Sequence, residues 1–331
     1  MTLVHIWIGL VGLVVILYVV LDGFSLGVGM LFPTADEESE RDQMMDSIAP
    51  VWDANQTWIV FGGGALFAAF PMIYTVLFSA LYVPLLTFLF GLIFRGVAFE
   101  FRANSSRKRQ WNTAFFWGCV VATFGQGVTL GAYISGIEVE NGLFAGGAMD
   151  WFTPFSVLVG MALIAGYVLL GSTYLLMKTE GAVQERAYRQ ATLAAWTVAG
   201  FMLLVSFWTP SVDPQIPVRW FSEPRVYIIW CFPVLGLVAF IALLTSIRAR
   251  REMAPFLWSL VLFLSAYLGL QAALYPLAIP PHVTIFDAAS QTKTQLFTLW
   301  GVILVLPVVL AYTIYSYSVF RGKVSVGEGY H

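Results

Sequence analysis

The first 32 residues, "MTLVHIWIGLVGLVVILYVVLDGFSLGVGMLF", form one apolar run whose single carboxylate is Asp22. A helix of about 20 mostly apolar residues is long enough to cross a lipid bilayer. The run lacks the basic residues with which a signal peptide begins, and it is longer than the apolar region of a signal peptide. The stretch therefore predicts a retained membrane-spanning helix at about residues 3–32.

The composition extends this prediction to the whole chain. Its 331 residues are 59% hydrophobic and only 11% charged, whereas an average soluble domain has about 25% charged residues. We expect an all-α polytopic membrane protein that forms a single integral membrane domain, 1–331, without a soluble domain. The dispersed basic residues give no indication of nucleic-acid binding. The two cysteines lie apart in apolar runs, which does not favour a disulfide or a thiolate metal site.

Apolar runs between charged or Pro/Gly breaks predict nine spans, the second being the weakest because "AAFPM" interrupts it. They lie at about 3–32, 53–71, 75–101, 112–135, 153–178, 188–208, 226–247, 255–275 and 294–320. With nine spans, the loops on one side hold thirteen Lys and Arg residues and those on the other hold three. Because basic loops stay in the cytoplasm, this bias predicts a periplasmic N-terminus and a cytoplasmic C-terminus. The acidic connection 34–49 is expected to contain a short surface helix.

Four ionisable residues are expected at similar depth on the cytoplasmic side. Asp22 lies far along the first span, Asp53 opens the second, and Arg95 and Glu100 lie near the end of the third. Such groups are costly inside a membrane and are therefore candidates for a proton path. The structural alternative is that Arg95 pairs with Glu100 or Asp53, while Asp53 only caps its helix.

Glycines are frequent in the first two predicted spans, with Gly23 and Gly27 in the first and "FGGGALF" in the second. The four-residue spacing of Gly23 and Gly27 permits close helix approach. We expect these helices to pack tightly against each other or against a second subunit.

The three histidines are poorly placed for haem. His5 is expected at the outer end of the first span, His282 in an outer loop and His331 at the C-terminus. Haem in a helical bundle usually needs axial ligands such as histidine, so we expect any haem to be held by a partner. In the same outer loop, Asp287 or Ser290 is expected to cap the last helix.

Three stretches resemble a known family: "VLDGFSLGVGML", "SIAPVWDANQTWIVFGGGALFAAFP" and "FRGVAFEFR" are similar to subunit II of the cytochrome bd-type ubiquinol oxidases. The most specific part contains Trp52, Asp53, Asn55 and Gln56, and "IFDAASQTKTQL", with Asp287 and Gln291, also fits. The compact length looks most like the cyanide-insensitive branch.

The resemblance implies a terminal oxidase of the bacterial cytoplasmic membrane that oxidises quinol and reduces oxygen to water. It implies that haems b and d, or b only, belong to subunit I, with which this chain would form a heterodimer. A small accessory subunit and a bound quinone are also implied. Among residues, it implies a cytoplasmic proton path through Asp22 and Asp53, and an oxygen route near Trp58.

Two departures from the family pattern stand in the motifs. Ser25 occupies the place of a second aspartate, and its hydroxyl can relay a proton but cannot hold a charge at neutral pH. Ala54 replaces the usual glycine between Asp53 and Asn55. Two other functions stay open from the residues alone, a secondary transporter with buried carboxylates and a purely structural partner subunit.

Overall fold

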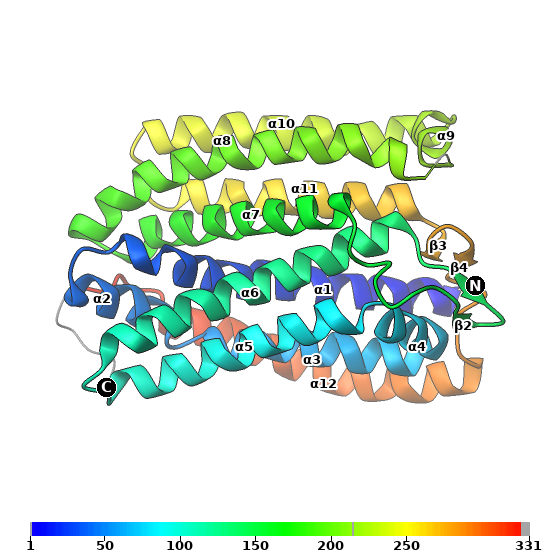
Figure 1. Cartoon of the computed structure of the whole chain (residues 1–331), viewed down its shortest axis with the longest axis horizontal. Coiled ribbons are helices and arrows are strands. Elements are labelled where there is room, and N and C mark those ends of the chain that lie inside the picture. Colours follow the sequence, from blue (N-terminus) through cyan, green and yellow to red (C-terminus); the bar gives the residue numbers. More distant parts are fainter. Residues whose placement is uncertain (1, 214, 326–331) are drawn as a thin grey trace.

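The computed structural model describes residues 2–213 and 215–325, which form long helices aligned along one axis (Figure 1). The α-helices of this part of the chain are α1 (Thr2–Leu31), α2 (Glu38–Ile48), α3 (Trp52–Ala69), α4 (Pro71–Ala80), α5 (Tyr82–Ala103), α6 (Lys108–Ser135), α7 (Pro154–Lys178), α8 (Gly181–Val212), α9 (Gln215–Phe221), α10 (Arg225–Arg248), α11 (Ala254–Leu274) and α12 (Thr292–Val319). The predicted all-α class is confirmed.

The remaining elements are short and lie between helices. They are the 3₁₀ turn η1 (Phe32–Thr34) and two antiparallel hairpins, β1 (Val139–Glu140) with β2 (Leu143–Phe144) and β3 (Leu277–Ile279) with β4 (Val283–Thr284). Both hairpins lie at the end of the bundle that also holds α4 and α9, opposite α2 (Figure 1).

Helix α1 is the centre of the bundle, because α3, α6 and α7 all pack against it. Glycine allows the closest of these approaches. A Cβ on Gly27 would overlap the carbonyl oxygen of Tyr167, and the facing Gly171 has the same restriction against α1. Gly23 faces the Tyr167 ring, and Gly62 of α3 faces Val14 of α1. The predicted packing of the two glycine-rich helices against each other is therefore present, since Gly62 of α3 faces α1, but the closest approach, at Gly23 and Gly27, is to α7.

Eight helices in the described ranges are long and apolar enough to cross a membrane, and α3 is not one of them. The predicted interruption of the second span is real, since the helix stops at Phe70 and resumes with Pro71 at the first position of α4. A second break at Leu81 separates α4 from α5, so the predicted third span, 75–101, includes part of α4 and most of α5. The count of nine spans and the orientation of the termini stay predictions.

The predicted helix in segment 34–49 exists as α2, but it is more than a surface element. One face of it is buried, including Met44, Ser47 and Ile48. The hydroxyl of Tyr174 in α7 donates a hydrogen bond to the carbonyl oxygen of Ser47 at 2.8 Å. Helix α2 thus closes one end of the bundle instead of lying freely on it.

Candidate functional site: a buried ion pair beside α1

Asp22 of α1 and Arg95 of α5 form an ion pair whose two side chains are both 0% exposed. The Nη1 atom of Arg95 lies 2.8 Å from Oδ1 and 2.9 Å from Oδ2 of Asp22. The guanidinium carbon also lies 5.4 Å from the centre of the Trp52 ring. An isolated charge in this interior would be very costly, so each of the two charges makes the other tolerable.

The pair leaves several buried polar atoms without a protein partner in the described part of the chain. Arg95 uses only one of its three nitrogens, and its Nε and Nη2 atoms have no acceptor. The Tyr18 hydroxyl, one helical turn before Asp22, interacts with the Asp22 carboxylate, while the hydroxyl of Ser25 and the indole nitrogen of Trp58 are unpartnered. Since buried polar groups normally find partners in protein or water, this region is suited to ordered water.

The backbone of α1 is tied to two other helices at the same place. Asn55 of α3 donates from Nδ2 to the carbonyl oxygen of Leu21 at 2.7 Å, and its Oδ1 accepts from the Tyr317 hydroxyl of α12 at 3.0 Å. Asn55 is fully buried. The motif residue Asn55 therefore positions the turn of α1 that precedes Asp22, and Tyr317 is a part of the site that the sequence did not reveal.

Asp53 and Glu100 do not join the pair. Both side chains are exposed and have no hydrogen bond or ion pair with any residue that the structure describes. The alternative in which Arg95 pairs with Glu100 or Asp53 is wrong, because Arg95 pairs with Asp22. Glu100 lies five residues further along the helix and therefore points about 140° away from Arg95. The capping alternative is also wrong, since Val51 is the N-cap of α3 and Asp53 lies within its first turn.

The two motif tryptophans are placed differently. Trp58 is fully buried. Trp52 packs against Phe99, with 4.8 Å between the two ring centres, and against the guanidinium group of Arg95. Gln56 is half-buried, and its amide nitrogen has no partner within the described residues. Trp52 thus shields one side of the ion pair.

The outer-loop motif serves the loop rather than the last helix. Oδ2 of Asp287 accepts hydrogen bonds from the backbone nitrogen of Thr284 at 3.1 Å and from its hydroxyl at 2.6 Å. These bonds lower the pKa of Asp287. Gln291 is the N-cap of α12, without a side-chain bond, while the backbone nitrogen of Ser290 donates to Ala69 at 2.9 Å. The prediction that Asp287 or Ser290 caps this helix is wrong.

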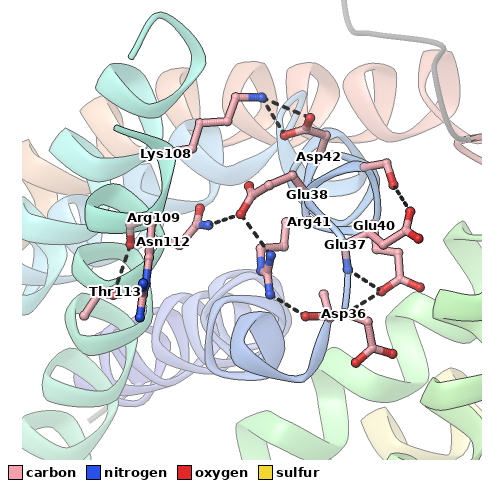
Figure 2. Close-up of polar contacts among 12 residues, drawn as sticks. Asp36, Glu37, Glu38, Glu40, Arg41, Asp42, Lys108, Arg109, Asn112 and Thr113 are labelled. Carbon is pink, nitrogen blue, oxygen red and sulfur yellow. Dashed lines mark hydrogen bonds and ion pairs between the residues drawn. The ribbon is translucent and has the colours of Figure 1, made fainter. Parts of the chain in front are cut away.

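The sequence reasoning missed a second group of charges, around α2. Arg102 at the end of α5 is only 3% exposed and binds Glu38 at 2.8 Å, Asp42 at 2.5 Å and the amide oxygen of Asn112 at 2.5 Å. Figure 2 shows Lys108 and Asn112 of α6 reaching the same two carboxylates. The sequence does contain a signal for this network, since the acidic segment 34–49 and the basic loop that follows the third predicted span lie on the same predicted side of the membrane.

Arg186 of α8 also binds the N-terminal part of α2 and the residues just before it. It donates to Glu40 at 2.9 Å and to Asp36 at 2.6 Å. The Arg186 hydrogen bond lowers the pKa of Glu40. For Asp42, burial raises the pKa, but the hydrogen bonds from Arg102 and Lys108 outweigh this and lower it. These contacts join α2 to both halves of the bundle.

Two of the three histidines, His5 and His282, lie within the described residues. The ring of His5 contacts the Tyr275 hydroxyl at 3.1 Å, and His282 is exposed beside a hairpin. His331 lies outside the described residues. No group of three or more His, Cys, Asp or Glu side chains that could hold a metal ion occurs in those ranges.

A family model for cytochrome bd terminal oxidase subunit II matches residues 3–320. The chain belongs to this family. Among its curated relatives, cytochrome bd-I ubiquinol oxidase subunit 2 of Escherichia coli is 30% identical, with 97% of this chain and 94% of the relative covered. Cytochrome bd ubiquinol oxidase subunit 2 of Bacillus subtilis is 26% identical over 97% of both chains.

A comparison with solved structures also supports the fold expected of this family. A chain of the bd oxidase from Geobacillus thermodenitrificans matches with a TM-score of 0.79 at 19% identity, over 97% of this chain and 99% of that one. The resemblance predicted from the motifs is confirmed, and the secondary-transporter alternative is dropped. The assignment to the cyanide-insensitive branch stays a prediction.

Proposed function

We propose that this chain, as subunit II of a bacterial quinol oxidase, supports quinol oxidation and oxygen reduction by conducting protons from the cytoplasm towards its partner. Haems b and d, or b only, would be held by subunit I, since His5 and His282 do not suit haem ligation here. The heterodimer would sit in the cytoplasmic membrane, with nine spans and a periplasmic N-terminus. A small accessory subunit and a bound quinone belong to the same proposal.

The observation that carries this proposal is the buried Asp22–Arg95 pair with its unpartnered neighbours. The two charges cancel, so the pair can persist in a medium where a lone charge could not. The hydroxyls of Tyr18 and Ser25 and the free nitrogens of Arg95 can hold water, and water joined by hydrogen bonds can pass protons. Asp22 would then be the fixed polar centre of the path.

Asp53 has the properties expected at the cytoplasmic entrance of this proton path. Its carboxylate is exposed and unpaired in the described structure, and it sits in the first turn of α3, next to the buried Trp52. The helix N-terminus favours an anion there, while water contact allows rapid protonation. Glu100 is also exposed, near the end of α5, and would be a second group that takes up protons from water. Trp58, buried among apolar side chains on α3, remains the candidate for the oxygen route.

The first test is Asp53→Asn in the purified complex. We expect quinol oxidase turnover to fall at least about tenfold, because the amide cannot exchange a proton as a carboxyl does, while haem absorption per complex stays unchanged. Glu140→Gln, which removes an exposed and unpaired carboxylate near the β1–β2 hairpin, is the matched control. Unchanged turnover in Asp53→Asn would exclude the entrance, and loss of haem would indicate a structural role.

The placement of haem in the partner has its own test. We expect His5→Ala and His282→Ala complexes to keep all haem bands in the reduced-minus-oxidised spectrum. Loss of one band in either variant would place an axial ligand on this chain.

A further inference from the structure

A groove of about 500 Å³ lies between the first half of α8 and the end of α10. Three arginines line it, together with the apolar side chains of Leu193 and Trp196: Arg189 of α8, Arg248 at the end of α10, and Arg250 two residues beyond it. No carboxylate is part of this lining. The groove is therefore both basic and partly apolar.

The positive charge of the groove is only partly balanced by the protein. Arg250 is engaged, since it binds both carboxylate oxygens of Glu185 at 2.7 Å and lies 4.6 Å from the centre of the Tyr188 ring. Arg189 and Arg248 are exposed and have no hydrogen bond or ion pair with any described residue. Two guanidinium groups, with up to ten N–H donors, are thus available to an anion.

An exposed apolar surface continues from the arginines along both helices. On α8, Leu193 is 71% exposed and Trp196 is 55% exposed, four and seven residues beyond Arg189 and so on the same face. On α10, Ile241 and Leu237 are exposed seven and eleven residues before Arg248. Both helices meet the length and apolarity of a membrane span. The basic groups therefore lie at the end of the surface that would face acyl chains.

We propose that this groove binds an anionic phospholipid, with its phosphate on Arg189 and Arg248 and its acyl chains along Leu193 and Trp196. Basic pockets between spanning helices at the membrane surface suit acidic headgroups, and tryptophan suits the boundary between headgroup and chain. In Figure 1, α8 and α10 form one edge of the bundle, beyond α7 and α11 as seen from α1. Free phosphate would use the arginines but would gain nothing from the apolar stripe.

The experiment uses the purified, delipidated complex and photoreactive phosphatidylglycerol, with attachment sites mapped by mass spectrometry. Phosphatidylglycerol should attach to peptides of α8 and α10, and photoreactive phosphatidylcholine should not. In Arg189→Gln/Arg248→Gln the apparent affinity at this site should fall roughly thirtyfold, because each basic side chain near an anionic surface contributes about fivefold. The control, Arg107→Gln/Arg109→Gln, removes two exposed, unpaired arginines elsewhere and should stay within about twofold of the wild type.

Three results would overturn the proposal. The first is equal labelling of α8 and α10 in the wild type and in Arg189→Gln/Arg248→Gln. The second is displacement of phosphatidylglycerol by inorganic phosphate at the same concentration, which would make the groove a phosphate site. The third is protection of Arg189 and Arg248 by a co-purifying protein subunit, found by cross-linking, since that subunit would occupy the lipid's place.

Discussion

Arg95 and Arg102 lie seven residues apart on the same face of α5, about 10 Å along the helix, yet they meet opposite surroundings. Arg95 has a single carboxylate partner, Asp22, and both side chains are fully buried. Arg102 is almost as buried, but its partners Glu38 and Asp42 are 43% and 40% exposed on their side chains. Bulk water can therefore replace Arg102 for Glu38 and Asp42, whereas the carboxylate of Asp22 has no contact with bulk water.

The largest effect is expected from Arg95→Leu, which leaves the carboxylate of Asp22 buried without its partner. Breaking a buried pair in this way costs about 3–5 kcal/mol of unfolding free energy. We expect a lower thermal unfolding midpoint of the purified complex and less complex in the membrane. Asp22→Leu/Arg95→Leu should regain most of that loss, because both charges are gone. A double variant as unstable as the single one would contradict the explanation by an unpaired charge.

A second effect concerns the packing that holds α1 in place beside the pair. In Gly27→Ala, the new methyl group meets the carbonyl oxygen of Tyr167 and the Gly171 nitrogen, both backbone atoms that cannot rotate away. Overpacking of this kind costs about 1–3 kcal/mol, measured by thermal unfolding. Gly63→Ala is the control, since nothing lies within 4 Å of its new methyl group. An equal loss in both variants would mean that α1–α7 packing is not the cause.

These residues also separate what the sequence could predict from what it could not. Asp22 was evident as the only carboxylate in a long apolar run. Its partner was not, because 73 residues separate it from Arg95 and only the packing of α1 near α5 brings them together. The exposure of Asp53 could have been read from the sequence, since the buried positions Trp52, Asn55 and Trp58 recur every three residues and Asp53 falls between them.

The glycine pattern had a similar limit. A spacing of four residues shows that some helix approaches closely, but it does not identify that helix, and α7 is more than a hundred residues away in the chain. The α2 network was missed for another reason. The number of loop arginines predicts the orientation of the chain, but it does not distinguish the buried Arg102 from the exposed Arg107.

Arg102→Gln should cost less than Arg95→Leu, about 1–2 kcal/mol, because hydrogen bonds to charged groups are lost but Glu38 and Asp42 become hydrated. The thermal midpoint of the complex is again the measure. Arg107→Gln, which removes an exposed charge five residues further along, should leave it unchanged within error. If Arg102→Gln were as destabilising as Arg95→Leu, the two sites would not differ in their access to water.

The smallest effect is a dependence on pH to which the α2 network should contribute. The pKa of Glu40 is lowered from 4.5 by the Arg186 hydrogen bond, and that of Asp42 is lowered from 3.8 in the net. A lowered pKa in the folded state adds stability above the unfolded pKa, and this stability is lost as the pH falls through the folded pKa. We expect the contribution of Glu40 and Asp42 to the thermal midpoint to be constant above about pH 5 and to fall below about pH 4. Glu40→Gln should lower the plateau and flatten the fall, and an unchanged slope would assign the acid sensitivity to other groups.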